Sequence, residues 1–222
     1  MKKSLFYIIL LLLVKANSIN AQLPAPFNAI LPSIQDSIAK KVLASPNAYR
    51  LQLVYTQIDR DQNGIPHFTN HALYADAENY FNPASMVKMP LAFLAMEKLY
   101  ELNQPDVNKY TTMQFDSNYQ RQVAMIADSS AQNKKPSIAH FIKRAFLISE
   151  NDPYNRLYQF VGQGPTNQKL LAKGYSSTKI TRQFMGYTED QNRHTNGVRF
   201  MDEKGLPILK LAPQYNKDSF QF

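Results

Sequence analysis

Two short patterns in the sequence combine residue types that can carry out acyl transfer. Ser85 lies three positions before Lys88, and Ser149 lies two positions before Asn151. A serine hydroxyl is a weak nucleophile until a neighbouring base takes its proton. A lysine in a dry pocket at the positive end of a helix can lose its own proton near neutral pH and become that base. The first pair therefore indicates nucleophilic catalysis by Ser85, with Lys88 as the proton acceptor.

The Ser-x-x-Lys pattern is weak by itself, because it occurs three times, starting at Ser37, Ser85 and Ser176. The first copy lies within an expected surface helix and the third in an expected loop. Only Ser85 follows a turn, over residues 80–84, and opens a long apolar helix, where positions i and i+3 share a face. The plain alternative is that Ser85 caps the helix and Lys88 is solvated.

The elements that must position these residues mix α and β structure. The helix that starts at Ser85 is apolar on nearly every face, which predicts burial inside a domain, and Pro90 predicts an irregular first turn. Ser137 is expected to cap the helix that leads to Ser149. Residues 162–165 are expected to end the helix over 153–161, and the residues beyond 186 are expected to have irregular structure. The predicted helices cover 34–43, 84–102, 138–148, 153–161 and 166–172, and a β-hairpin joins 50–58 to 67–74.

Residues 1–21 are typical of a secretory signal peptide, with two lysines, an apolar run over residues 5–14 and Ala21 before the cut. A membrane span needs roughly 20 apolar residues, so we expect cleavage rather than anchoring. The chain has no cysteine, which excludes disulfides and thiolate metal sites and suits the periplasm. The net charge of +8 includes Lys2, Lys3 and Lys15, whose loss would leave +5. Export argues against nucleic acid as a partner.

Together the two patterns resemble the active-site motifs of a known family. Residues 81–88 are similar to the Ser-x-x-Lys segment of class A β-lactamases and penicillin-binding proteins, and residues 148–157 to their Ser-Asp-Asn segment. The resemblance covers roughly residues 34–182. It implies an α+β fold with three α-β-α layers, in which an antiparallel sheet packs against helices and an all-helical lobe, as one domain over residues 22–222.

The resemblance also implies a role for each of the four residues. Ser85 would form an acyl-enzyme, and Lys88 would accept its proton. Ser149 would relay a proton to the leaving nitrogen, since a hydroxyl both donates and accepts, and Asn151 would hold Lys88 and the substrate amide. No cofactor and no metal are implied.

Three functions remain open from the sequence. The first is hydrolysis of the β-lactam amide by a periplasmic monomer, the second is a D,D-peptidase acting on peptidoglycan peptides, and the third is a non-catalytic periplasmic binding module on the same fold. The substrate in the first two cases is a small molecule or a short peptide.

Departures from the family pattern bear on these alternatives. Glu150 stands where the family has Asp, and Phe184 stands where class A β-lactamases place the deacylating Glu, while Glu189 comes later. The family's Lys-Ser/Thr-Gly motif is absent, and the nearest matches, Lys173-Gly174 and Lys204-Gly205, lack the hydroxyl residue. We therefore expect that the chain stops before this motif and that the C-terminal part of the fold is missing.

Two metal-like patterns have simpler interpretations. Residues 59–64 match the start of an EF-hand calcium loop, but its twelfth position is Asn70 and the flanks are expected strands. Asn63-Gly64 as a hairpin turn explains this segment better. His67 and His71 can share a strand face, but the sequence shows no third zinc ligand.

Overall fold

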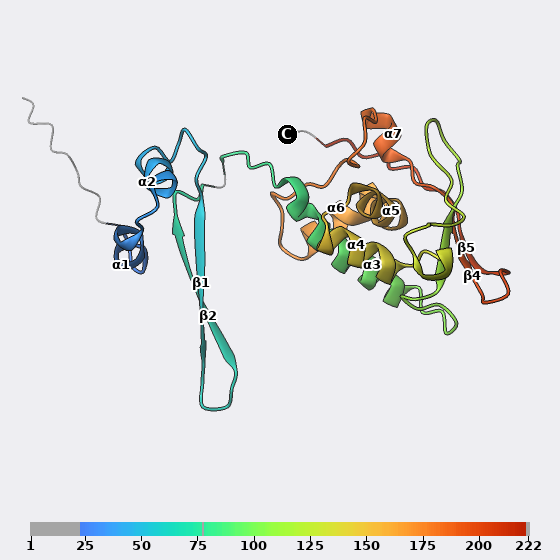
Figure 1. Ribbon diagram of the computed structural model, residues 1–222, viewed down its shortest axis with the longest axis horizontal. Coiled ribbons are helices and arrows are strands. Elements are labelled where there is room, and N and C mark those ends of the chain that lie inside the picture. The colour runs from blue at the N-terminus through green and yellow to red at the C-terminus, as the bar shows by residue number, and fades with distance from the viewer. Residues whose placement is uncertain (1–22, 77, 221–222) are drawn as a thin grey trace, which may run out of the picture. The chain divides into compact units, whose positions relative to one another are not determined.

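The computed structural model describes residues 23–76 and 78–220, which divide into two compact units (Figure 1). The first unit ends at Phe81 and the second begins at Asn82. The signal peptide predicted over residues 1–21 lies outside the described residues. Both units combine helices with a small antiparallel sheet, so the expected α+β class is confirmed. The three-layer arrangement and the single domain over residues 22–222 stay predictions. Between residues 23 and 220, no described helix is long and apolar enough to cross a membrane.

The first unit holds two short α-helices, a 3-10 turn and a β-hairpin. Helix α2 begins three residues later than predicted, because the Asp36 side chain accepts the backbone N–H of Ala39 at 2.7 Å and caps it there. The predicted hairpin is confirmed as an antiparallel pair. Its turn uses Gly64 in the left-handed region, with φ 77°. The elements are α1 (Phe27–Ile30), η1 (Leu31–Ser33), α2 (Ser37–Ala44), β1 (Leu53–Arg60) and β2 (Pro66–Leu73).

The second unit contains most of the helices. As predicted, Ser137 caps the helix that leads to Ser149: its hydroxyl accepts the backbone N–H of His140 at 3.2 Å. The predicted end of the helix at Val161 is confirmed, but the break is shorter than residues 162–165, because only Gly162 leaves the helical conformation, with φ 94°. Pro165 falls in the first turn of the next helix, where its missing N–H has no partner to lose. The elements are η2 (Ala84–Val87), α3 (Lys88–Glu101), η3 (Gln132–Lys134), α4 (Ile138–Leu147), α5 (Asn151–Val161), α6 (Gln163–Ala172) and α7 (Glu189–Arg193).

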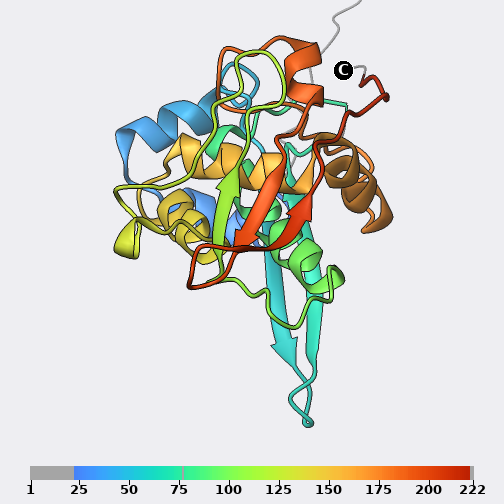
Figure 2. The same ribbon diagram turned by 90° about the vertical axis from the view of Figure 1, so that its right-hand side faces the viewer.

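A three-stranded antiparallel sheet completes this unit, with β3 (Thr112–Phe115), β4 (Val198–Met201) and β5 (Pro207–Leu211) in that order (Figure 2). Two of the strands lie in the stretch beyond residue 186, so the prediction of irregular structure there is wrong. These strands are too short for an alternating pattern to stand out. The sheet packs on the helices through aromatic pairs, Phe115 with Phe141 and Phe160 with Phe200, each with ring centroids 5.9 Å apart.

Helix α3 lies beside α4, α5 and α6 (Figure 1). It is buried on one face only. Leu91 and Leu94 are buried in the core, whereas Met89 and Phe93 are more than half exposed. The prediction that this helix is buried on nearly every face is therefore wrong, since its partners cover a single side. The irregular first turn is confirmed, because the 3-10 turn η2 precedes α3.

Candidate active site

The turn before α3 brings the Ser85 hydroxyl over the Lys88 amine. Asn82 shapes this turn by accepting the backbone N–H of Ala84 at 3.1 Å, and Ala84 adopts a left-handed backbone with φ 46°. Ser85 then lies in the 3-10 turn η2, and Lys88 is the first residue of α3. Residues i and i+3 eclipse in a 3-10 turn. The two side chains therefore lie on one face, with the Lys88 Nζ 3.2 Å from the Ser85 Oγ.

Lys88 is the centre of a cluster formed by two distant segments. Its side chain is buried, with the residue only 4 % exposed, while Ser85, Ser149 and Asn151 around it are exposed. The Lys88 Nζ donates to the Ser149 Oγ at 3.1 Å and to the Asn151 Oδ1 at 2.9 Å. It also donates to the Ser149 backbone carbonyl. A buried amine thus connects three polar side chains that solvent and a substrate can reach.

Ser149 owes its position to an unusual backbone. It occupies the left-handed region with φ 52°, between the end of α4 and the start of α5. For a residue with a Cβ this conformation costs roughly 1–2 kcal/mol. The bond from Lys88 to the Ser149 carbonyl stabilises it on one side. On the other side, the Arg144 Nε donates to the Glu150 Oε2 at 2.5 Å.

Burial changes the pKa of the Lys88 amine. Desolvation lowers the pKa of Lys88 from its ordinary value of 10.5, and the negative charge of Glu150 partly opposes that shift. A lower pKa makes the neutral amine easier to form, and a neutral amine can take a proton from a hydroxyl. The cluster therefore combines an exposed hydroxyl on Ser85, an amine with a lowered pKa and a second hydroxyl that can both accept and donate a proton.

The aromatic ring of Phe184 lies next to the Lys88 amine. Its ring centroid is 5.3 Å from the Lys88 Nζ, and its backbone N–H donates to the Asn155 Oδ1 of α5 at 2.8 Å. The ring also packs on Tyr154, with centroids 4.7 Å apart. Glu189, the next carboxylate along the chain, pairs with Arg193 on α7. At this position an aromatic ring contributes to the dry environment of the amine.

Helix α5 is tied to α3 at both ends. At its start, Asn151 accepts from Lys88, and at its end the Lys98 Nζ donates to the backbone carbonyl of Phe160 at 2.5 Å. Every residue of α5 from Pro153 to Val161 is buried. Since Lys88 and Asn151 begin these two helices, their distance is set by packing along the whole length of α3 and α5.

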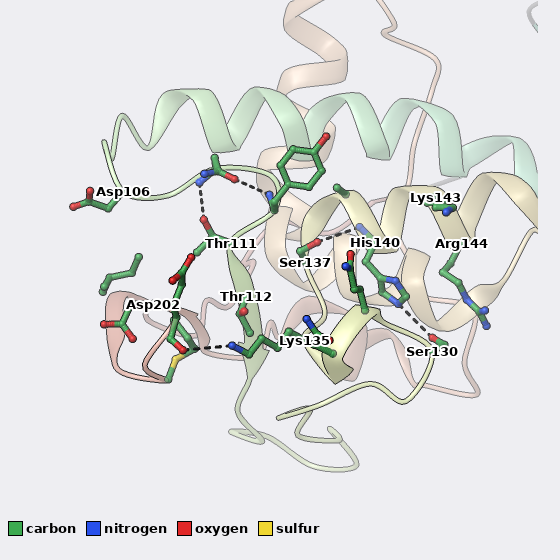
Figure 3. A pocket seen from close by; sticks show the side chains of 18 of the residues that line it. Asp106, Thr111, Thr112, Ser130, Lys135, Ser137, His140, Lys143, Arg144 and Asp202 are labelled. Carbon is green, nitrogen blue, oxygen red and sulfur yellow. Dashed lines mark hydrogen bonds between the residues drawn. The ribbon is translucent and has the colours of Figure 1, made fainter.

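A second serine cluster lies on the wall of a cavity of about 1420 Å³ formed by α4 and the sheet (Figure 3). The Ser130 Oγ donates to the Asp128 Oδ1 at 2.6 Å, and the His140 Nε2 lies 2.9 Å from the Asp128 Oδ2. The same His140 Nε2 also lies 3.3 Å from the Ser130 Oγ, so one ring nitrogen faces both the carboxylate and the hydroxyl. In a hydrolytic triad the two ring nitrogens of the histidine face different partners, one the carboxylate and the other the serine. Although the three residue types match a hydrolytic triad, this geometry closes a loop and does not activate a nucleophile.

The metal-like patterns are explained by local structure. The Asp61 Oδ1 accepts the backbone N–H groups of Asn63 and Ile65, each at 2.8 Å, and so closes the hairpin turn. The strands β1 and β2 flank it, as predicted. His67 lies 3.7 Å from Asp61, and the His71 ring lies beside Tyr55. Within the part of the chain that is described, no group of three His, Cys, Asp or Glu side chains is placed to hold a metal ion.

The structure thus brings together all four residues singled out from the sequence, Ser85, Lys88, Ser149 and Asn151, and their catalytic roles remain a prediction. The other two Ser-x-x-Lys copies lie elsewhere: Ser37 begins the exposed helix α2, and Ser176 lies in a loop. Arg144 was missed by the sequence analysis. The available signal was a basic residue in the last turn of a predicted helix, six positions before an acidic one.

Comparison with known proteins agrees with this geometry. The model of the beta-lactamase enzyme family matches residues 35–203, which include both motifs. No curated protein and no solved structure gives a significant match. The family match spans most of the chain and contains the Lys88 cluster, so we conclude that the protein belongs to the beta-lactamase enzyme family.

Proposed function

We propose that the protein is a serine hydrolase that opens the amide of a β-lactam through an acyl-enzyme on Ser85. The observation that carries this proposal is the buried Lys88 amine, hydrogen-bonded at once to Ser85, Ser149 and Asn151. The family match supports the reaction class, and the cluster supports the residues. The proposal includes export to the periplasm through the signal peptide, a small-molecule substrate and the predicted three-layer fold.

The proposed reaction follows from the positions of the donors. Neutral Lys88 takes the proton of the Ser85 hydroxyl, and the Oγ forms a bond to the amide carbon. The backbone N–H of Ser85 is the proposed donor to the developing oxyanion. When the carbon–nitrogen bond breaks, Ser149 passes a proton to the leaving nitrogen and recovers one from Lys88. Asn151 holds Lys88 through its Oδ1, so its amide N–H₂ is free to bind the substrate carbonyl.

A second candidate, a D,D-peptidase acting on peptidoglycan peptides, is favoured by Phe184. The side chain against Lys88 is an aromatic ring and not a carboxylate. A ring cannot prime a water molecule for attack on the acyl-enzyme, so a covalent adduct with a β-lactam would persist. A cell-wall peptidase behaves in this way toward penicillin, because it takes the antibiotic as a poor substrate.

Covalent labelling tests the proposal. Incubation with a fluorescent penicillin should add its mass to the protein, and Ser85→Ala should abolish the adduct. Ser176→Ala is the matched control, because it removes the serine of another Ser-x-x-Lys copy and should leave labelling unchanged. A wild-type protein that never acquires the mass would refute the acyl-enzyme, and retention on peptidoglycan without acylation would identify the non-catalytic module.

Turnover separates the two enzymes. Repeated release of hydrolysed penicillin indicates a β-lactamase. A stable adduct, together with release of D-alanine from a peptide ending in D-Ala-D-Ala, indicates the peptidase.

A further inference from the structure

An ion pair beside the four polar residues, Arg144 with Glu150, holds the turn that carries Ser149. We propose that this pair positions Ser149 and shields Lys88 from the charge of Glu150. The inference rests on the proposed function, in which Ser149 and Lys88 carry protons. In this arrangement Arg144 and Glu150 are positioning residues, because they contact each other and not the substrate.

The pair closes a very short connection. Helix α4 ends at Leu147 and α5 begins at Asn151, so only three residues join them. Arg144 lies in the last turn of α4 and Glu150 directly precedes α5, and their Nε and Oε2 atoms are 2.5 Å apart. The ion pair therefore spans the connection from one helix to the other.

Ser149 is held from two sides within this connection. Lys88 donates to its backbone carbonyl, while the neighbouring Glu150 is fixed by Arg144. A left-handed backbone at a residue with a side chain persists only where the surroundings determine it. Without Arg144, Glu150 loses its anchor and the turn can relax, which moves the Ser149 hydroxyl away from the Lys88 amine.

Glu150 also acts on Lys88 through its charge. It raises the pKa of Lys88 against the larger effect of desolvation. The Arg144 guanidinium lies against the same carboxylate and offsets that field, and the pair is only partly exposed, with side chains 33 % and 35 % accessible. The other titratable groups around the cluster are Asp128 and His140 beside Arg144, and Tyr154 and Arg182 behind Phe184.

The glutamate at this position fits the proposal. The family pattern has an aspartate between the serine and the asparagine, and the longer side chain of Glu150 adds one methylene of reach. That reach is used to contact Arg144, six residues earlier on α4. The departure from the family pattern therefore has a partner in this chain.

Two substitutions with opposite electrostatic effects test the proposal. Glu150→Gln removes the negative charge near Lys88, so the pKa of Lys88 should fall. The acid limb of the pH–rate profile, over which the acylation rate rises with pH to its plateau, should therefore move to lower pH. Arg144→Gln leaves that charge uncompensated, so the pKa and the acid limb should move to higher pH. Both variants should lower the plateau rate by about tenfold or more, since the Ser149 hydroxyl is displaced.

The double variant and a remote control separate charge from position. Arg144→Gln combined with Glu150→Gln should return the acid limb toward its wild-type position but keep the low plateau. Glu101→Gln is the matched control, because it breaks an ion pair with Lys169 at the far end of α3 and should change neither quantity. Shifts of the same sign in both single variants, or no shift, would overturn the proposal.

NMR gives a readout that does not need a reactive substrate. The pKa of Lys88 can be titrated on isotopically labelled lysine, and the Cα shift of Ser149 reports its left-handed backbone. If wild-type protein is not acylated, the proposed function fails, and these two signals still decide the role of the ion pair. Unchanged signals in Glu150→Gln and Arg144→Gln would refute it.

Discussion

The second unit contains two clusters that pair a serine with a possible base, and in both clusters the surroundings lower the pKa of that base. At Ser85 the possible base is Lys88, whose pKa is lowered by desolvation from 10.5. At Ser130 the base is Asp128. Burial raises the pKa of Asp128, but hydrogen bonds from Ser130 and His140 outweigh that effect and lower it below 3.8.

The same direction of shift has opposite chemical consequences. A lysine with a lowered pKa gives up its proton more readily and is more often a free amine, whereas an aspartate with a lowered pKa is a weaker proton acceptor. Ser130, His140 and Asp128 have the residue types of a hydrolytic triad but not its geometry, because a single ring nitrogen of His140 faces both of the other side chains. The environment of the base, more than the set of residue types, therefore distinguishes a candidate nucleophile from a serine that only closes a loop.

The largest effect is expected at Lys88. Lys88→Met keeps an unbranched side chain in the buried site but removes the base, so acylation should slow by about 10²–10⁴-fold. Thermal stability reflects two opposing effects, because the variant no longer buries an amine but loses the hydrogen bonds to the Ser149 carbonyl and the Asn151 Oδ1. His140→Ala in the other cluster is the parallel change and should leave acylation unaltered. Intact-mass measurement of the adduct against time gives the acylation rates of both variants. Equal losses of rate would show that the Lys88 cluster is not distinguished from the Asp128 cluster in the reaction.

A smaller effect is expected at Ser149, where two variants separate the hydroxyl from the backbone. Ser149→Ala and Ser149→Gly both remove the proton relay and should slow acylation by about 10²-fold. Glycine adopts the left-handed backbone without strain, so Ser149→Gly should be more stable than Ser149→Ala by about 1 kcal/mol. Chemical denaturation measures that difference. An alanine variant as stable as the glycine variant would show that the turn is not strained.

The smallest effect is expected at Asp128 and concerns stability only. Because the folded pKa of Asp128 is lowered, its ionised form stabilises the fold above pH 3.8, and this contribution is lost as the pH falls through the folded pKa. Asp128→Asn should therefore reduce the free energy of unfolding by about 1 kcal/mol at neutral pH. The gap to wild type should narrow in acid, and acylation should stay the same. A tenfold loss of acylation in this variant would place the second cluster in the reaction.

Much of the helical framework could be predicted from the sequence, because long apolar stripes and caps such as Ser137 are local signals. The grouping of Ser85, Lys88, Ser149 and Asn151 could be anticipated only through resemblance to a family, since the two segments meet through tertiary packing. The sheet of β3, β4 and β5 escaped prediction, because its four- and five-residue strands have no clear alternation. The role of Arg144 could not be inferred, because it depends on the left-handed turn at Ser149.

Helix α5 is expected to resist local unfolding at the site. It is buried from Pro153 to Val161, and α3 donates a hydrogen bond to each of its ends, from Lys88 and from Lys98. A helix held in this way cannot fray by itself, so opening it requires the cooperative melting of the surrounding core. Asn151 therefore has no low-energy route out of place, and warming the protein should leave its reactive centre intact until the whole unit unfolds.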